Sequence, residues 1–371
     1  MIGMPVEPRV TEYLYRKATA AGVPLSGTFE LTPVCNMDCK MCYVRLSRQE
    51  QERRGALLDA DQWLQLGQQA KDAGMLYLLL TGGEPFLHPQ IQQIIEGLHQ
   101  MGLLISINTN GTLLDEKTIA WLQNCPPVRL NLSIYGASNE TYDRLCGNPK
   151  GFTQLTNAVD SLQKAGLDVK LNCSLTPDNQ DDLAAMVAFA RDRQLPIQVA
   201  TYMFPPVRKN GDLVGENHRF TPEEAAYYMA YADYLTLGKE RFLASLDQIP
   251  QPADPEDSCR DLGDGIRCRA GKCSFWVTWQ GKILPCGMFP ESHSRCLLEQ
   301  PFAAAWDLVK ADTATIRLPA GCAGCAAKDL CHACAAMVLT ESGCFDKVPA
   351  YRCQMMHAYH AQRNRVKEEM L

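Results

Sequence analysis

Residues 28–43 read TFELTPVCNMDCKMCY, where a short strand pattern leads directly into three closely spaced cysteines. Polar and apolar residues alternate over the first five positions, which predicts a strand with one buried face. Cys35, Cys39 and Cys42 follow, so we expect them on the loop at the carboxyl end of that strand. In barrels of parallel strands this end carries the chemistry. The stretch therefore predicts an α/β fold whose first strand brings three thiols to the active-site end.

The following sequence alternates strand patterns with amphipathic helix patterns, for example at Asp59–Ala73, Gln90–Met101 and Phe152–Ala165. Such alternation predicts a parallel sheet, here a partial (β/α)6 TIM-like barrel of the α/β class. The six strand candidates are Thr28–Pro33, Leu76–Thr81, Leu103–Thr109, Val128–Ile134, Val169–Leu175 and Ile197–Met203.

Polar residues occupy every second position in several of these strands, as in Ser106-Ile107-Asn108 and Lys170-Leu171-Asn172. Successive strand residues face opposite sides, so the apolar set can pack on outer helices while the polar set faces the lumen. Closed barrels usually fill the lumen with branched apolar side chains. We therefore expect an open cavity that holds a polar ligand.

The chain divides into three parts by composition. Residues 1–27 form a lead-in with a helix at Val10–Ala21, residues 28–247 the barrel, and residues 258–371 a cysteine-rich domain. The Pro- and Asp-rich segment Gln248–Asp257 marks the boundary. Further expectations are a loop at Pro205–Asn217, one helix over Phe220–Phe242 capped by Thr221, and a C-terminal helix from Tyr351 to Leu371.

Composition limits the classes of partner. The net charge of −6 gives no reason to bind nucleic acid, and no apolar run reaches the roughly 20 residues of a membrane helix. The N-terminal residues do not resemble a signal peptide, so we expect a cytoplasmic protein. Seventeen cysteines in a reducing compartment indicate metal sites rather than disulfides. Eleven of them follow Ser258, which predicts a second metal region.

Three thiolates at the C-x3-C-x2-C spacing can hold three irons of a cubane cluster. The fourth iron is then free to bind a substrate or cofactor. The alternative is a structural zinc site, which needs a fourth ligand. His88 could supply one, although its spacing does not indicate it.

The cysteine triad followed by Tyr43 resembles the defining signature of the radical S-adenosylmethionine (SAM) superfamily. Residues 82–85 (GGEP) and 109–111 (TNG), after the second and third strands, resemble further segments of it. The resemblance implies one [4Fe-4S] cluster on Cys35, Cys39 and Cys42, where an electron splits SAM into methionine and a 5′-deoxyadenosyl radical that abstracts hydrogen from a substrate. The implied SAM contacts are Tyr43, Gly82, Gly83, Glu84, Asn110 and Ser133.

The later cysteines resemble the SPASM domain, an auxiliary-cluster module of peptide-modifying radical SAM enzymes. By this resemblance Cys268, Cys273, Cys286 and Cys334 would hold a first auxiliary cluster, and Cys322, Cys325, Cys331 and Cys353 a second. Three [4Fe-4S] clusters are then expected. Cys334 departs from the family spacing by one residue, and not all relatives supply Cys273. Two zinc knuckles are the alternative.

Six cysteines remain, and we assign none of them as a hydrogen donor: Cys125, Cys146, Cys173, Cys259, Cys296 and Cys344. Cys173 lies on a strand but shares a face with Val169, Leu171 and Leu175, so we expect it to pack outward.

The SPASM resemblance implies a peptide substrate that is crosslinked, epimerised or oxidised. Haem-precursor or other small-molecule chemistry is an alternative. Sulfatase maturation to formylglycine is another, but relatives with that activity carry an acid where this chain has Gly287. A non-catalytic electron carrier or redox sensor would not need the GGEP and TNG segments.

The expected partners follow from the same resemblance. The 27 residues before the first strand are too few for a leader-binding domain, so a separate leader-binding protein, or direct binding, is expected. Arg208 and Lys209 could contact a substrate carboxylate, or could simply be a solvated basic pair. A ferredoxin or flavodoxin would donate electrons, and the oxygen-sensitive cluster suggests an anaerobic setting.

Overall fold

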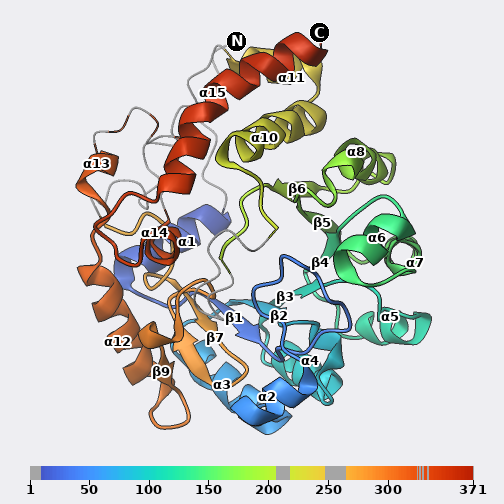
Figure 1. Cartoon of the computed structure of the whole chain (residues 1–371). Coiled ribbons are helices and arrows are strands. Elements are labelled where there is room, and N and C mark those ends of the chain that lie inside the picture. Colours follow the sequence, from blue (N-terminus) through green and yellow to red (C-terminus); the bar gives the residue numbers. More distant parts are fainter. Residues whose placement is uncertain are drawn as a thin grey trace.

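The computed structural model describes residues 10–205, 218–246, 265–323, 325, 327, 330–331 and 334–370. Its centre is one nine-stranded sheet in the order β6-β5-β4-β3-β2-β1-β7-β8-β9. The first six strands pair in parallel and coil into a partial barrel with helices on the outside (Figure 1). They are β1 (Ser26–Glu30), β2 (Tyr77–Thr81), β3 (Leu104–Thr109), β4 (Arg129–Ile134), β5 (Val169–Ser174) and β6 (Ile197–Ala200). The predicted α/β class is thus confirmed.

The helices along the barrel alternate with these strands as the sequence predicts. In chain order they are α1 (Val10–Ala21), α2 (Arg48–Arg54), α3 (Ala60–Asp72), α4 (Ile91–Gln100), α5 (Glu116–Leu122), α6 (Asn139–Cys146), α7 (Gly151–Lys164) and α8 (Leu183–Asp192). Short 3-10 turns lie at Pro85–Leu87, Gln180–Asp182 and Glu291–His293.

Three predicted elements differ from the structure. β1 covers Ser26–Glu30 and not Thr28–Pro33, and β6 ends at Ala200 and not at Met203. The single helix predicted over Phe220–Phe242 is two helices, α10 (Pro222–Leu237) and α11 (Lys239–Leu246). Gly238 separates them with a φ of 79°, a left-handed conformation that a continuous right-handed helix cannot contain. Thr221 caps α10 as predicted, because its side chain accepts a hydrogen bond from the Glu224 amide.

The barrel core lies between the outward faces of the strands and the helices that cover them. Every second residue of β3 and β4 is fully or almost fully buried, for example Ile107 and Leu132. Trp63 of α3 packs on Phe29 of β1 with 4.9 Å between ring centroids. Burying aromatic side chains of this size supplies much of the favourable free energy of folding.

The cysteine-rich region extends the barrel sheet. Its first strand, β7 (Ser274–Val277), pairs in parallel with β1. β8 (Lys282–Leu284) and β9 (Arg295–Cys296) then add antiparallel strands. The helices of this region are α12 (Phe302–Thr315), α13 (Ala320–Ala323), α14 (Ala335–Ser342) and α15 (Ala350–Met370). The proposed boundary Gln248–Asp257 lies outside the described residues.

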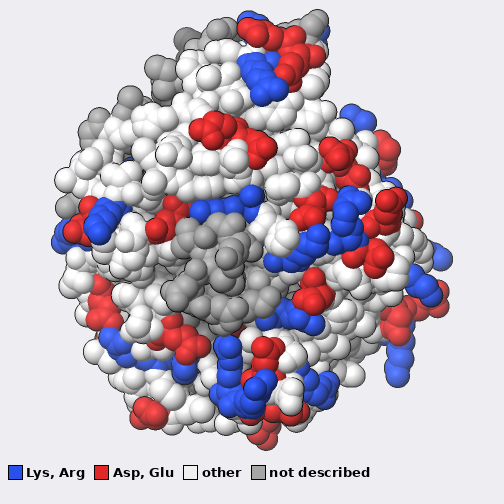
Figure 2. Space-filling view, viewed as in Figure 1, with Lys and Arg blue, Asp and Glu red and all other residues white. Residues whose placement is uncertain are grey.

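Long-range contacts join this region to the rest of the chain. Trp306 of α12 donates a hydrogen bond to the Gly22 carbonyl, and α12 also packs beside α3. The last helix, α15, lies along α10 (Figure 1). Acidic and basic side chains are interspersed over the face shown in Figure 2. Among the described helices, none combines the length and the apolar character needed to cross a bilayer.

Because β7 covers the edge of β1, we predict that the barrel does not fold alone. A chain that ends at Leu246 would expose the β1 backbone edge and the apolar faces that α12 covers. We expect this truncated chain to be mostly insoluble, or to lack a cooperative unfolding transition by circular dichroism. A soluble monomer that unfolds cooperatively would contradict the prediction.

Candidate active site

A cavity of about 400 Å³ lies at the carboxyl ends of the parallel strands. It brings together the three cysteines of the first loop and residues from the ends of five strands, β2 to β6. Of the predicted site residues, Cys35, Cys39, Cys42, Tyr43, Gly82, Gly83, Asn110 and Ser133 all line it.

The cysteine loop is held against the end of β2 by backbone contacts. The Gly83 amide donates to the Thr32 carbonyl at 2.7 Å, and the Glu84 amide donates to the Val34 carbonyl at 2.9 Å. A Cβ atom on Gly83 would lie 2.5 Å from the Val34 carbonyl oxygen, and one on Gly82 equally close to the Thr32 oxygen. The two glycines are therefore needed for the close approach of two backbone segments.

Glu84 is fully buried, and its carboxylate connects the same turn to β3. It accepts hydrogen bonds from the Asn110 amide and the Thr109 hydroxyl, both at 2.8 Å. Burial raises the pKa of this carboxyl to about 7, although the hydrogen bonds act in the opposite direction. Glu84 is absent from the cavity lining, so the structure gives it a bracing role.

Hydrogen-bond donors surround the thiols of the loop. The Met37 amide points at Cys35 Sγ at 3.4 Å, and the Arg45 amide points at Cys42 Sγ at 3.3 Å. Asn110 Nδ2 reaches Cys35 Sγ at 3.7 Å and donates to Asn36 Oδ1 at 2.9 Å. Amide donors of this kind stabilise thiolate ligands and tune the potential of an iron–sulfur cluster.

The opposite side of the loop rests on the end of α6. The Asp38 and Lys40 amides donate to the carbonyls of Cys146 and Leu145, the last two residues of that helix.

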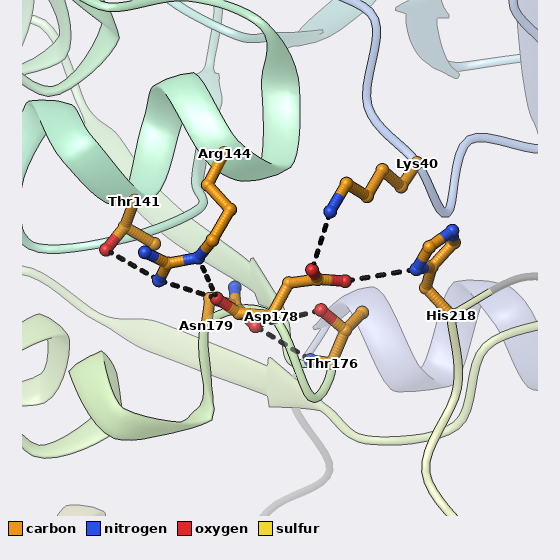
Figure 3. Close-up of polar contacts among 7 residues, drawn as sticks. All are labelled: Lys40, Thr141, Arg144, Thr176, Asp178, Asn179 and His218. Carbon is orange, nitrogen blue, oxygen red and sulfur yellow. Dashed lines mark hydrogen bonds and ion pairs between the residues drawn. The ribbon is translucent and has the colours of Figure 1, made fainter.

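A charged cluster around Asp178 completes the anchorage (Figure 3). Asp178 pairs with Lys40 of the cysteine loop at 2.7 Å and with His218 at 3.2 Å. Arg144 of α6 donates to the Asp178 carbonyl at 2.9 Å. Four separate segments thus fix the loop that presents the thiols.

The environment of the triad suits a positively charged metal centre. Burial raises the pKa of Cys35 to about 12. The contact with the Cys146 thiol, followed by burial, raises the pKa of Cys39. Three neighbouring thiolates would repel each other here unless cations lay between them. His88 is not available as a fourth ligand for zinc, because it is buried and both of its ring nitrogens have other partners. Its Nε2 lies 2.9 Å from the Leu58 carbonyl oxygen, and its Nδ1 accepts a hydrogen bond from the Gln90 amide.

The part of the cavity wall that β3 and β5 form is polar, as the strand alternation predicts. Asn108, Asn172 and Ser174 line it, whereas Cys173 faces outward with its sulfur 3.9 Å from Met186 of α8. The expectation that Cys173 packs outward is confirmed. Several further lining residues were not predicted from the sequence, among them Tyr135, Tyr202, Phe204 and Met288. The alternation from Ser133 could have indicated Tyr135, but no local signal points to Met288.

The four cysteines of the predicted second auxiliary cluster lie around one small cavity. Cys322, Cys325, Cys331 and Cys353 line it together with Arg267 and His357. His357 Nε2 lies 3.6 Å from Cys325 Sγ. Among the described residues, no group of three or more His, Cys, Asp or Glu side chains converges on one point as a single metal ion requires. Sulfurs spread around a cavity suit a multi-iron cluster better than tetrahedral zinc.

Three of the four residues predicted for the first auxiliary cluster are neighbours. Burial, followed by the nearby Cys334 and Cys268 thiols, raises the pKa of Cys286 to about 12. Cys273 packs instead against α1, with its sulfur 3.1 Å from Thr19 Oγ1 and Ala18 and Leu25 around it. Cys259, Arg208 and Lys209 lie outside the described residues.

Comparisons with known proteins agree with this site. The family model "Radical SAM superfamily" matches residues 29–190. The AdoMet-dependent heme synthase of Methanosarcina barkeri is 25% identical over 85% of this chain and 92% of its own length. The antilisterial bacteriocin subtilosin biosynthesis protein AlbA of Bacillus subtilis is 25% identical over 73% of this chain and 57% of its own length.

Solved structures share the fold. SuiB of Streptococcus suis bound to S-adenosylmethionine has a TM-score of 0.67 at 19% identity, covering 94% of this chain and 84% of SuiB. SuiB bound to its precursor peptide SuiA gives the same TM-score over 92% and 81% of the two chains. Residues 29–190, which include the three cysteines, thus match the radical SAM superfamily, and relatives of the chain are SPASM-type, peptide-modifying radical SAM enzymes.

The close contact between Gly83 and Val34 yields a prediction. Gly83→Ala would push the cysteine loop away from β2, at a cost of about 1–3 kcal/mol in unfolding free energy. We expect it to lose the iron of the triad, about four atoms per chain, in an anaerobic iron assay. Gly166→Ala is the matched control, because it strains a positive φ with no atom nearby and should keep its iron. Full iron content in Gly83→Ala would contradict the prediction.

The raised pKa of Glu84 predicts a pH dependence. Its folded value of about 7 lies above the ordinary 4.5, so the folded chain binds this proton more tightly than the unfolded chain. The free energy of unfolding should therefore fall by up to roughly 3 kcal/mol as the pH rises from about 4.5 to about 7. Glu84→Gln should lack this part of the slope in urea titrations of the iron-free chain, and the exposed Glu52→Gln should keep it. An unchanged slope in Glu84→Gln would count against this assignment.

Proposed function

We propose that this chain cleaves SAM reductively on a [4Fe-4S] cluster held by Cys35, Cys39 and Cys42, and then modifies a ribosomally made peptide by crosslinking, epimerisation or oxidation. The observation that carries the proposal is the single cavity in which the three thiols meet the ends of β2, β3 and β4. When bound, the reduced cluster supplies the electron that splits SAM, and the radical that results removes a substrate hydrogen.

The residues of the cavity suggest how SAM would be held. The Gly82 and Gly83 backbone would face its amino group, and Asn110 and Ser133 would supply polar contacts beside it. Tyr43, next to Cys42, offers an aromatic wall on the same side. Glu84 would act mainly through Asn110, because its carboxylate accepts the Asn110 amide. A direct contact of Glu84 with the SAM amino group stays a prediction.

We propose two auxiliary [4Fe-4S] clusters in the C-terminal region. The cavity lined by Cys322, Cys325, Cys331 and Cys353 supports one of them. The proximity of Cys268, Cys286 and Cys334 supports the other. Cys273 is the predicted fourth ligand of that cluster. Its thiol contacts Thr19, so the start of β7 would have to shift before Cys273 could bind the cluster.

Two observations support a peptide as the substrate. The relative AlbA is named for the biosynthesis of the bacteriocin subtilosin, and SuiB, which shares the fold, has been solved in complex with its precursor peptide. Gly287 packs under the Trp276 indole, where an added Cβ would lie 2.7 Å from the ring. No acidic side chain fits at that position, which argues against the base used in sulfatase maturation.

Haem-precursor chemistry is the second candidate. It is favoured by the heme synthase relative, whose length this chain covers almost completely. A porphyrin would need a wide cavity mouth, whereas a peptide needs a channel for an extended chain. We place the peptide first because a second cavity, which shares the lining residues Ala200 and Tyr202 with the first, lies beside β6.

The remaining partners are part of the proposal. We propose a ferredoxin or flavodoxin as the electron donor and a cytoplasmic, anaerobic setting. Peptide recognition would use a separate leader-binding protein or direct binding to this chain.

The test uses the full chain reconstituted anaerobically with iron and sulfide. With SAM and dithionite it should form 5′-deoxyadenosine, and Cys35→Ala, Cys39→Ala and Cys42→Ala combined should reduce that rate by at least about a thousandfold. Cys125→Ala, away from the cavity, is the matched control. Cleavage that persists in the triple variant would refute the mechanism.

The substrate class has its own test. A short precursor peptide encoded beside the gene should change in mass or chirality during SAM turnover. Turnover of a haem precursor, with every such peptide unchanged, would favour the second candidate.

A further inference from the structure

A groove runs along the free edge of the barrel sheet. β6 is the last strand of the sheet, and among the described residues its only strand neighbour is β5. α10 lies beside this edge, and α15 lies along α10 (Figure 1). Residues of the strand and of both helices line a cavity of about 440 Å³. Its lining residues are Ile197 to Tyr202 on the strand side, Met229, Ala232, Asp233 and Thr236 on α10, and Arg352 and Met355 on α15.

The backbone of β6 presents a regular row of hydrogen-bonding groups to this groove. The Leu171 and Leu175 amides of the β5 segment donate to the Pro196 and Ala200 carbonyls. Because alternate residues of a parallel strand point their backbone groups to opposite sides, those of Ile197 and Val199 point away from β5. They repeat at about 6.6 Å, twice the rise per strand residue. Only another extended backbone offers partners at that spacing.

The groove adjoins the cavity that the three cysteines line. Ala200 and Tyr202 line both of them. A chain that lies along the β6 edge therefore reaches the cavity within a few residues. The side chain of Tyr202 is fixed at this junction, because its hydroxyl donates to Glu341 of α14 and its ring packs edge-on to Phe204.

The helices protect the edge without filling it. Exposed sheet edges normally recruit other strands, and proteins cover them to prevent aggregation. Here α10 and α15 exclude a second sheet but leave the groove open. Its walls mix apolar Met229 and Met355 with the charged Asp233 and Arg352, a combination that suits a peptide with both side chains and backbone amides.

We propose that an extended segment of the peptide substrate binds in this groove as an additional strand on β6, and enters the SAM cavity past Ala200 and Tyr202. The inference rests on the proposed peptide substrate, which it deepens by naming the recognition surface and the mode of binding. The main-chain pairing supplies affinity with little dependence on sequence, and the α10 and α15 side chains select among residues of the segment.

The experiment uses the full, cluster-reconstituted chain with SAM bound. A displayed library of random peptides of roughly twelve residues, long enough at about 3.3 Å per residue to span β6 and reach the cavity, is selected for binding. Dissociation constants of the enriched peptides are then measured by fluorescence anisotropy. Val199→Pro removes an outward amide donor without breaking a bond to β5, and should weaken binding about tenfold. Val199→Thr is the matched control and should stay within about twofold of the wild type.

A second measurement does not depend on any variant folding. Each backbone nitrogen of an enriched peptide is methylated in turn and tested against the unaltered chain. We expect a loss of about tenfold at every second position of one stretch of the peptide. Effects without this alternation, equal binding to Val199→Pro, or the absence of enriched peptides would overturn the inference. If peptides bind at β6 but are never modified, the proposed binding of a strand to β6 stands, and only the proposed peptide-modifying function is refuted.

Discussion

The close packing of the cysteine loop on the β2 turn is the constraint on which the rest of the site depends. Two glycines let the backbones of residues 32–34 and 82–84 meet, and no larger side chain fits between them. The Glu84 carboxylate accepts hydrogen bonds from Thr109 and Asn110 at the end of β3. The Asn110 side chain in turn donates to Asn36 and Cys35 of the cysteine loop. The cysteine loop, the β2 turn and the end of β3 thus contact one another, and these contacts hold the three thiols in place. Preorganisation of this kind lets a site bind a cluster and a ligand without paying to order the loop.

The same principle extends outward from the loop. The end of α6 and the Asp178 cluster fix its far side, because the Asp38 and Lys40 amides donate to the last carbonyls of α6 and Lys40 also pairs with Asp178. The C-terminal region completes the barrel by adding β7 to β1, and it contributes Met288 to the cavity wall. The cysteine-rich region is consequently tied to the barrel through the sheet itself.

Much of this could be predicted from the sequence, because its signals are local. Period-two alternation located all six barrel strands, and the spacing of Cys35, Cys39 and Cys42 located the metal loop. The pairing of β7 with β1 could not be predicted, since it joins segments at opposite ends of the chain. The role of Glu84 was also hidden, because a motif cannot show whether a carboxylate faces a cavity or the wall behind it. The sequence shows a glycine at position 238, but only its positive φ shows that the helix ends there.

The central claim is that SAM binds the open iron of the cluster on Cys35, Cys39 and Cys42. Electron–nuclear double resonance tests it most directly, with the reduced protein and SAM labelled with ¹⁵N at its amino group. To isolate this cluster, the measurement uses a variant in which the proposed ligands of both auxiliary clusters are replaced by alanine, namely Cys268, Cys273, Cys286 and Cys334 together with Cys322, Cys325, Cys331 and Cys353. We expect a ¹⁵N hyperfine coupling to the cluster. This coupling should be lost or weakened in the Asn110→Ala variant. A cluster signal that SAM does not alter, with no ¹⁵N coupling, would contradict the account.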